Sequence, residues 1–452
     1  MVNEAWRPQH LGRPFPFRQR GGRSFEAPNR LVAQPMESNA AAEDLFLPGL
    51  LGMEPQDIVA RCRELVQDES YVRQHFMYDA ERVQRRGFPS AFQFLDVAER
   101  AQGGFGISFF EATAYDVGGL ARLMGGLLNE ETAPAYRKLV EVFRASCLDP
   151  RQLFMVQLGH AGWCGTEPVS FRNYLGQGIH QPSEEKLEQI LDGIVRSATL
   201  AQEVGFDGAD IKACHGYFLA DWLSYLMKGA NTRSEGEVRL QPYLAFMQHV
   251  RDAVGDDFLV GARVSFYEGV PNGWGVKYDP SVPADLPLDH TTLEKYGSVE
   301  IDLRAPLYYA AIMREHLDFF NSSLGTPVGS PTLVRPTRRR NPAGLILHIH
   351  ITKRVQETVG KDFAVIGSGY TSGGVHAPIL ADYVVGAGHA QFAGFGRATL
   401  ADRHFARKVL QGDLDSITFC DLDDSICSHL LAAQKTAVGC YRNQVIDLVR
   451  TK

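Results

Sequence analysis

The amino-acid sequence predicts an α/β protein that folds as a single (β/α)8 barrel, or TIM barrel. Three observations predict this fold: apolar strand-like segments alternate with helical patterns, the strands number eight, and glycine-rich turns follow the last two. Alternation of strands and helices implies parallel pairing, and eight strands favour closure into a barrel. The 452 residues fit this fold once insertions are counted.

The expected strands are short runs rich in aliphatic and aromatic residues. They lie near Arg30–Met36, Gly104–Glu111, Gln152–Leu158, Asp207–Lys212, Phe258–Ser265, Leu317–Ser322, Phe363–Gly367 and Gln391–Gly396. Apolar residues at helical spacing predict helices at Ala135–Ala145, Glu184–Val204, Leu240–Val254, Leu345–Thr358 and Val375–Gly386. No linker or internal repeat divides the chain, so we expect one domain with an arm and inserts.

The segments outside the barrel have their own composition. Residues 1–28 are rich in Arg, Pro and Gly and predict an extended arm before a barrel at residues 29–410. A helical insert at about residues 42–88, with Pro55 at a helix start, follows the first strand. It either hangs over the strand ends as a lid or decorates the surface. Residues 411–452 are expected to form a tail.

The overall composition excludes several classes of partner. The chain is 44% hydrophobic and 22% charged, with a formal charge of −7, so we expect neither nucleic acid nor an anionic membrane as a partner. Seven cysteines in a chain of this length do not make a disulfide framework. The segment from Met1 to Arg20 has no apolar core typical of a signal peptide, and no run is long enough for a membrane span. The sequence predicts a cytoplasmic protein.

A cation, an imidazole and a phenol close the fourth strand, at Lys212, His215 and Tyr217. Catalytic groups of barrel enzymes lie at the C-terminal ends of strands. Strand alternation would put Lys212 and His215 on opposite faces, so they converge only if the strand breaks, which Gly216 permits. The simpler alternative makes Lys212 half of a buried ion pair with Asp210, and leaves the histidine and tyrosine as interior residues.

Two glycine-rich turns predict a phosphate site. Gly367-Ser368-Gly369 follows the seventh strand, and Gly396-Arg397 follows the eighth. Barrel enzymes often bind phosphate between these two loops, where glycines let backbone N–H groups approach the oxygens and an arginine adds a clamp.

Two polar residues fall within strands that should be buried. Gln157 ends the third strand, and Arg263 lies within the fifth. A buried arginine needs an anionic partner, because an unpaired buried charge is costly. That partner is either Glu111, Asp210 or a ligand that becomes negative during turnover.

Taken together, these segments resemble the old yellow enzyme family of flavin-dependent oxidoreductases. The matching pieces are Asn29–Met36, Glu111–Ala114, Gln157–Gly162, Gly205–Tyr217, Val264–Ser265, Gly394–Arg397 and Ala401–Asp402. They span residues 29 to about 410, nearly the whole expected barrel.

The resemblance implies an FMN-carrying barrel reduced by NADH or NADPH. It places Gln157 on the pyrimidine edge of the flavin, Arg263 near its N1–C2=O2 edge, and Pro35, Met36 and Ala112 against the ring. The implied phosphate-binding residues are Gly367, Ser368, Gly369, Gly396 and Arg397. His215 would bind the activating oxygen of the substrate, and Tyr217 would deliver a proton to the carbon next to it.

The sequence departs from the family pattern in four places. Glu37 stands where a threonine or small residue commonly touches the flavin, and Lys212 replaces the first histidine of the substrate pair. An ammonium there favours a carboxylate, an enolate or a thioester oxygen over a neutral ketone. The arginine-bearing loop after the fourth strand is shortened to Asn231–Arg239.

The fourth departure is at the C-terminal end. Larger relatives carry an iron–sulfur cluster and a further nucleotide-binding domain there. Cys420, Cys427 and Cys440 lack a close Cys-x-x-Cys pair and make a poor cluster site, so no metal is expected. This chain therefore resembles a short form of the family, whose tail is either a remnant or a cap on the barrel.

The sequence thus predicts an FMN-dependent oxidoreductase of the ene-reductase type. Its expected small-molecule partner is an electron-poor alkene, a carbonyl compound or a thioester, and the reverse desaturation uses the same groups. Two rival hypotheses are an isomerase or lyase that binds a phosphorylated substrate, and a flavin-binding protein without turnover. The sequence leaves a homo-oligomer open and does not identify the oligomeric state.

Overall fold

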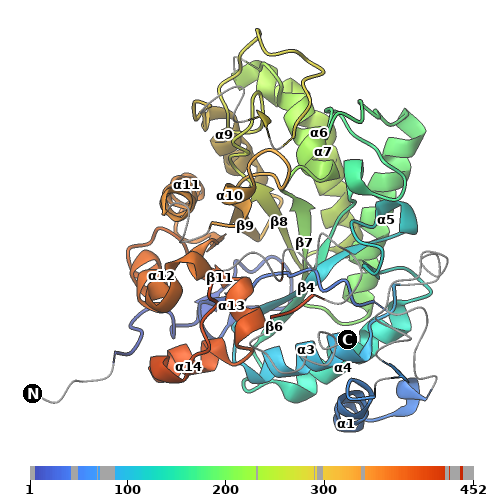
Figure 1. Cartoon of the computed structure of the whole chain (residues 1–452), viewed down its shortest axis with the longest axis vertical. Helices are drawn as coiled ribbons and strands as arrows, with labels where there is room; N and C mark the ends of the chain where they lie inside the picture. The colour runs from blue at the N-terminus through green and yellow to red at the C-terminus, as the bar shows by residue number, and fades with distance from the viewer. Residues whose placement is uncertain are drawn as a thin grey trace, which may run out of the picture.

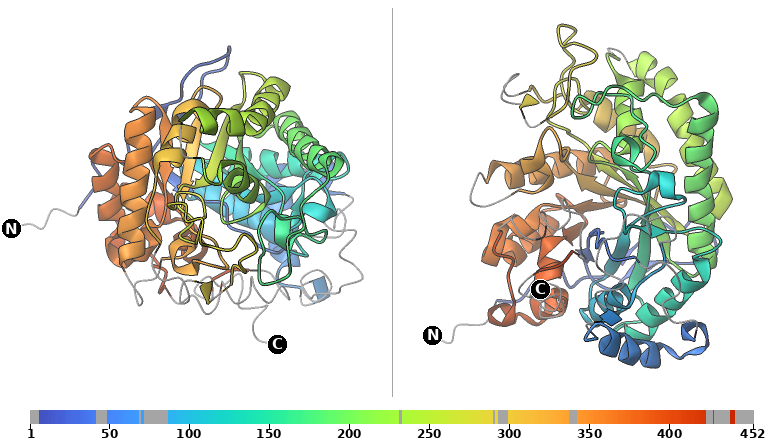
Figure 2. Two further views of the ribbon diagram at one scale, coloured as in Figure 1. Left: turned by 90° about the horizontal axis from the view of Figure 1, so that it is seen from above. Right: turned by 45° about the vertical axis from the view of Figure 1, so that its right-hand side comes forward.

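The computed structural model describes residues 6–41, 49–68, 70–71, 87–230, 233–289, 291–292, 299–336, 342–422, 427 and 438–440. Over these residues the chain forms the predicted (β/α)8 barrel, with helices outside a central ring of parallel strands (Figure 1, Figure 2). The strands are ordered β3-β11-β10-β9-β8-β7-β6-β4, and pairing of β3 with β4 closes the ring.

Each of the eight barrel strands coincides with an expected segment. They are β3 (Leu31–Ala33), β4 (Ile107–Ala114), β6 (Leu153–Leu158), β7 (Gly208–Ala213), β8 (Leu259–Ser265), β9 (Phe319–Ser323), β10 (Ala364–Gly367) and β11 (Phe392–Phe395). A short strand, β5 (Gly126–Leu127), adds in parallel to the end of β4.

Helices on the outside of the barrel follow the strands. They are α1 (Pro55–Leu65), α3 (Ala91–Gln102), α4 (Ala133–Ser146), α5 (Glu184–Glu203), α6 (Phe218–Met227), α7 (Arg233–Val254), α9 (Arg304–Met313), α10 (Pro331–Val334), α11 (Ala343–Val359), α12 (Ala377–Gly386), α13 (Arg397–Ala401) and α14 (Phe405–Gln411). Within the described residues, none of them has the length and apolar character needed to cross a bilayer.

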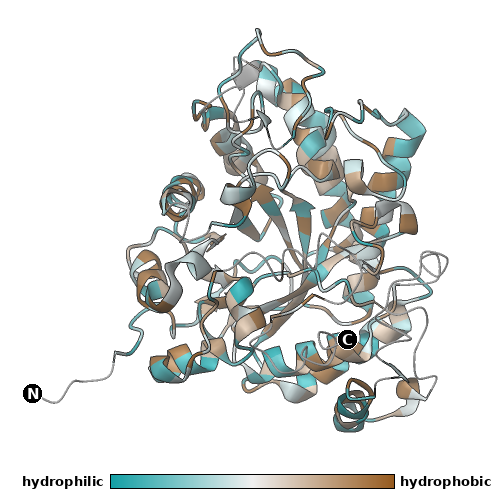
Figure 3. Ribbon diagram, viewed as in Figure 1, coloured by the Kyte–Doolittle hydropathy of each residue, from teal (hydrophilic) through white to brown (hydrophobic). Residues whose placement is uncertain are grey.

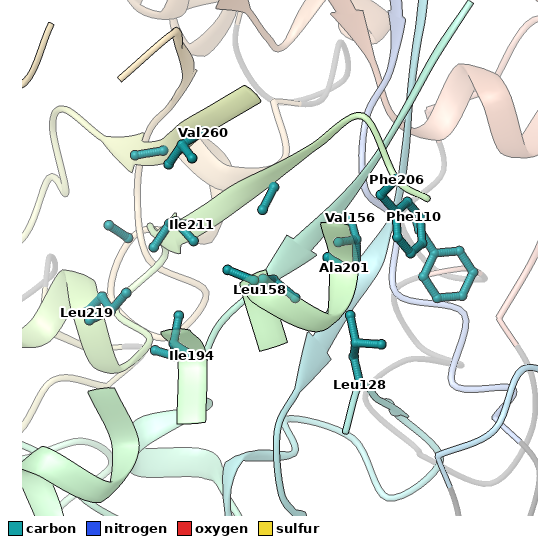
Figure 4. Close-up of a cluster of buried hydrophobic side chains, with 14 of the residues drawn as sticks. Phe110, Leu128, Val156, Leu158, Ile194, Ala201, Phe206, Ile211, Leu219 and Val260 are labelled. Carbon is teal, nitrogen blue, oxygen red and sulfur yellow. The ribbon is translucent and has the colours of Figure 1, made fainter. Parts of the chain in front are cut away.

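Alternation along the strands separates an outer face from an inner one. Outward residues such as Val156, Ile211 and Val260 pack against Ile194 and Ala201 of α5 and other helix residues (Figure 4). The helices carry hydrophilic residues beside hydrophobic ones, as expected when one face meets the barrel and the other meets solvent (Figure 3). This packing is the main hydrophobic core.

The inner face changes from apolar to polar along the barrel axis. At the N-terminal ends of the strands, Ile107, Met155, Leu259, Phe319 and Phe392 fill the interior. Further along several strands the inward residues are polar, as at Gln157, Asp210 and Asn321. The barrel is therefore packed at one end and presents hydrogen-bonding groups at the other, the end where barrel enzymes hold their ligands.

The N-terminal arm is more ordered than the sequence suggests. Its strands β1 (Phe15–Pro16) and β2 (Glu26–Ala27) pair antiparallel and put Phe15, Phe17 and Phe25 into the apolar interior cluster. The ring of Phe15 contacts that of Phe392 edge-on, with centroids 5.1 Å apart. The arm thus plugs the packed end of the barrel.

Two alternatives were open for the insert after β3, a lid over the strand ends or a surface decoration, and its described part fits the second. Helix α1 packs Ile58, Cys62 and Leu65 onto α3 and α4, at the periphery of the barrel (Figure 1). Its apolar stripe needs a hydrophobic partner, and the outer surface of these two helices supplies it. The surface alternative is therefore correct for residues 49–68 and 70–71, while residues 42–48, 69 and 72–86 lie outside the described chain.

The segment expected as a shortened loop is helical where the structure describes it. Helix α7 begins at Arg233 rather than Leu240 and continues through Pro242, while residues 231 and 232 are outside the described chain. Helices α3, α6 and α9 were not predicted. Helix α3 begins with a capping box, in which Ser90 and Gln93 satisfy each other's backbone N–H groups.

We predict that Gly261→Ala lowers the free energy of unfolding by roughly 1–3 kcal/mol, because added volume in a packed core is destabilising. A Cβ at this position would lie 2.2 Å from the ring of Phe319, inside the barrel. Urea denaturation measures the change. Gly52→Ala is the matched control, since its Cβ would meet open space. Equal midpoints for the two variants would contradict the packing argument.

Candidate active site

A cavity of about 440 Å³ opens at the polar end of the barrel. Its walls come from residues at or beyond the C-terminal ends of the strands, and include twelve of the residues singled out in the sequence: Pro35, Met36, Glu37, Gln157, Lys212, His215, Tyr217, Arg263, Ser368, Gly369, Gly396 and Arg397. This volume is within the range typical of small-molecule and cofactor sites.

Two expected residues do not line this cavity. Ala112 faces a smaller neighbouring pocket, which shares Glu37, Lys212 and Tyr217 with the main one. Gly367 ends β10, where a Cβ would lie 2.3 Å from the hydroxyl of Tyr370. Close packing on Tyr370 also requires a glycine here, and the expected contact of Gly367 with a ligand phosphate stays a prediction.

A buried hydrogen-bond network forms the floor of the cavity. Gln157 Nε2 donates to Asp210 Oδ2 at 2.8 Å, and Asn321 Nδ2 donates to the same oxygen at 3.0 Å. Asn321 and Gln34 exchange a reciprocal pair of amide hydrogen bonds at 2.8 and 2.9 Å. Because Asp210 holds the Nε2 of Gln157, the amide oxygen of Gln157 remains to accept a hydrogen bond from a ligand.

Arg263 borders this network without a carboxylate partner. Glu111, one expected partner, instead accepts hydrogen bonds from Ser38 N and from Gln93 Nε2. Burial raises the pKa of Asp210 to about 6 against the opposing charge of Arg263, but no ion pair joins them. Within the described residues, the buried Nε of Arg263 has no hydrogen-bond partner. A guanidinium in this state is suited to an anionic or oxygen-rich ligand.

Glu37, another residue of the cavity wall, joins two cations. Its Oε1 lies 2.7 Å from Lys212 Nζ, and its Oε2 lies 3.1 Å from Arg122 Nε. The ammonium of Lys212 also sits 3.8 Å from the ring centroid of Tyr217. The expected alternative of a Lys212–Asp210 pair is therefore wrong, because the pair forms with a residue 175 positions away in the chain.

The charges in this cluster set one another's protonation. Burial opposes the ionised form of Glu37, but Lys212 and Arg122 outweigh it and lower the pKa to about 2. Burial likewise opposes the ammonium of Lys212, and Glu37 raises its pKa. Burial and Glu37 raise the pKa of Tyr217 to about 12, against the opposing effect of the two cations. At neutral pH the tyrosine therefore keeps its proton.

His215 occupies a turn that reverses the direction of its side chain. Strand β7 ends at Ala213, and His215 has a positive φ of 60°, unusual for a residue with a side chain. Its N–H donates to Ser265 Oγ at 2.9 Å, and its Nε2 lies 2.7 Å from Ser323 Oγ. Burial first, and then the charges of Arg263 and Lys212, lower the pKa of the imidazole well below its usual value. The ring is neutral at physiological pH.

The glycine-rich loops after β10 and β11 meet at one end of the cavity. Gly369 has φ 88°, a conformation that favours glycine, and Ser368 directs its hydroxyl to the carbonyl of Ser322. Arg397 Nη2 donates to the carbonyl of Pro336 at 2.8 Å. Ser368, Gly369, Gly396 and Arg397 thus lie together as expected, although two of these side chains already have protein partners.

Residues of the C-terminal tail also reach the cavity. Cys427 and Val438 contribute to its wall, and Val438 N donates to the carbonyl of Ser38 at 2.6 Å. The expectation of a cap is therefore favoured over that of a remnant. Across the described residues, no group of three His, Cys, Asp or Glu side chains is arranged to hold a metal ion.

Several wall residues carried no signal in the sequence. Arg122 follows β4 without a motif, and Trp163 and Cys164 form the turn η4 (Gly162–Cys164) after β6. Arg335 comes from the segment between α10 and α11. Gln34 precedes Pro35 in a matched segment and could have been found there. The other wall residues reach the cavity only through contacts between segments that are distant in the sequence.

Residues 89–277 match the NADH:flavin oxidoreductase / NADH oxidase family. An NADPH dehydrogenase of Listeria monocytogenes serotype 4b is 31% identical over 157 residues, which cover 33% of this chain and 44% of the relative. A metal reductase of Desulforamulus reducens is 24% identical over 329 residues, which cover 71% of this chain and 44% of the relative. The matches thus span less than half the length of each of these curated relatives.

Solved structures share the fold across nearly the whole chain. A 2-naphthoyl-CoA reductase in complex with 2-naphthoyl-CoA aligns over 96% of this chain and 57% of its own, with a TM-score of 0.66 and 17% identity. The old yellow enzyme homologue from Zymomonas mobilis aligns over 92% of this chain and 96% of its own, with a TM-score of 0.55 and 15% identity. The sequence match to the NADH:flavin oxidoreductase / NADH oxidase family thus covers residues 89–277, and these solved structures show that the chain shares their fold.

Proposed function

We propose that the chain is an FMN-dependent oxidoreductase that uses NADH or NADPH to reduce an activated C=C bond, or that runs the reverse desaturation. The observation that carries the proposal is Arg263, whose buried Nε has no partner within the described residues and which lines the cavity beside Gln157. A flavin edge offers the oxygen and the developing negative charge that this guanidinium lacks.

The cavity fits FMN at both of its ends. Gln157 presents its amide oxygen and Arg263 its guanidinium, which suit the N–H and oxygen groups of the isoalloxazine edge. Gly369, Gly396 and Arg397 form the other end and suit a phosphate. Pro35 and Met36 supply apolar wall between them. Bound FMN would supply the hydride-transfer chemistry that no amino-acid side chain provides.

Tyr217 is the proton donor in this proposal. It keeps its proton at neutral pH, because its pKa is raised to about 12 by burial and Glu37. When the proton leaves, the phenolate would form beneath the ammonium of Lys212, 3.8 Å from the ring centroid. That cation stabilises the negative charge at the moment it develops, which is the condition for effective acid catalysis.

His215 positions the substrate oxygen. Its imidazole is neutral, so it keeps one N–H donor and one acceptor nitrogen. Ser323 fixes the ring through Nε2, which directs the rest of the imidazole to the cavity wall that it shares with Tyr217. A carbonyl or thioester oxygen of an electron-poor alkene matches this arrangement. Which of these substrates is used belongs to the proposal. So does a cytoplasmic location.

We predict that Arg397→Ala weakens flavin retention about tenfold or more, because a charge-assisted hydrogen bond to a phosphate contributes roughly 1.5–3 kcal/mol. The absorbance spectrum of the purified protein after dialysis measures the bound flavin. Arg403→Ala is the control: Arg403 is also buried, but it pairs with Asp96 outside the cavity. A colourless wild-type protein would favour a direct phosphate-binding isomerase or lyase instead.

We predict that Tyr217→Phe slows the oxidation of the reduced enzyme by an alkene roughly 10²–10⁴-fold, the usual contribution of a general acid. Reduction by NADPH needs no proton from this residue and should change little. Stopped-flow absorbance separates the two half-reactions. Tyr370→Phe removes the hydroxyl of another buried tyrosine, outside the cavity wall, and should alter neither. Equal losses in both half-reactions of Tyr217→Phe would contradict the assigned role.

A further inference from the structure

One wall of the cavity holds more positive than negative charge. Glu37 is the single carboxylate of the wall cluster, and it is shared between Lys212 at 2.7 Å and Arg122 at 3.1 Å. With Glu37 and Lys212 ionised, as their pKa shifts indicate, the three groups sum to one net positive charge. Arg122 supplies this excess, because Lys212 alone would balance Glu37.

Two further carboxylates lie near this cluster: Asp210 faces Arg263 more strongly than Lys212, and burial raises the pKa of Glu111 to about 7, so Glu111 is only partly ionised at neutral pH. The side chains of Lys212, Glu37 and Arg122 are only 7%, 14% and 19% exposed, so water screens them weakly. The thiol of Cys164 and the phenol of Tyr217 stay neutral, since burial raises their pKa values to about 11 and about 12. A buried, unbalanced cation is costly unless an anion joins it.

Arg122 also keeps hydrogen-bonding capacity. Its Nε binds Glu37 and its Nη1 donates to the carbonyl of Ala121 at 3.1 Å. Its Nη2 has no partner within the described residues, and the side chain lines the main cavity. Trp163 and Tyr217 contribute aromatic surface to the same cavity. A guanidinium beside apolar surface is a typical receptor for a carboxylate on an unsaturated or aromatic body.

We propose that Arg122, with Lys212, forms an anion-binding subsite, and that the substrate carries a carboxylate that occupies it. A single carboxylate matches the single excess charge. The inference rests on the proposed function, because it names the substrate class of the same cavity. It assigns Arg122 as a specificity-determining residue, separate from Arg263 and Arg397, which face the flavin edge and the phosphate.

The test is calorimetric binding of two probes of nearly equal shape, trans-cinnamate and neutral cinnamamide, to the purified protein. Arg122→Gln should weaken cinnamate binding about tenfold or more, the scale of a charged hydrogen bond, and change cinnamamide binding less than about twofold. Arg122→Lys keeps the charge and should retain most of the affinity. Arg144→Gln is the control, since Arg144 pairs with Asp207 at the other end of β7.

The variant Glu37→Gln should change the affinity for cinnamate in the opposite direction. It removes the one carboxylate of the cluster, so cinnamate should bind several-fold more tightly than to wild type, a gain that damage to the fold would not produce. Equal losses for cinnamate and cinnamamide in Arg122→Gln, or no loss for either, would overturn the subsite. A colourless protein that still binds cinnamate through Arg122 would overturn the flavin proposal and support the subsite, so the two failures are distinguishable.

Discussion

The polar end of the barrel depends on one buried carboxylate. Asp210 is fully buried, accepts hydrogen bonds from Gln157 and Asn321, and faces the charge of Arg263. A buried carboxylate is tolerated only when its oxygens are satisfied, so these neighbours are held in one arrangement. Through Asn321 the network extends to Gln34 at the end of β3. Side chains around the barrel thus take their orientation from a single group that does not line the cavity itself.

The fold could be predicted because barrel strands are buried on both faces and read as short apolar runs. The missed helices lacked the usual pattern. Helix α6 is apolar almost all round, so it shows no amphipathic stripe, and α7 starts with seven mostly polar residues and contains Pro242. The sequence could not decide whether α1 forms a lid or packs on the outside of the barrel. An apolar stripe shows that a helix needs a hydrophobic partner, but not which surface provides it.

The site was predictable where the chemistry is local to one strand end. Lys212, His215 and Tyr217 lie within six residues, and the break that lets them share one cavity was expected from Gly216. The partner of Lys212 was not predictable from the sequence. Either Glu37 or Asp210 could pair with its ammonium, and only the closed barrel decides which of them lies close enough. Arg122 gave no signal for the same reason: a lone arginine in a loop is usually a solvated residue.

Folding stability and chemistry make opposite demands on the cluster at Glu37. Stability alone favours one cation for one carboxylate, since each further buried charge must be desolvated. Arg122 adds a second cation at a site where it is largely shielded from water. The second cation is stabilised only when negative charge appears beside it, either on the phenol of Tyr217 as its proton leaves or on a bound anion. In the two proposals, both events need the same sign of charge at the same wall, so the excess cation would serve substrate recognition and proton transfer together.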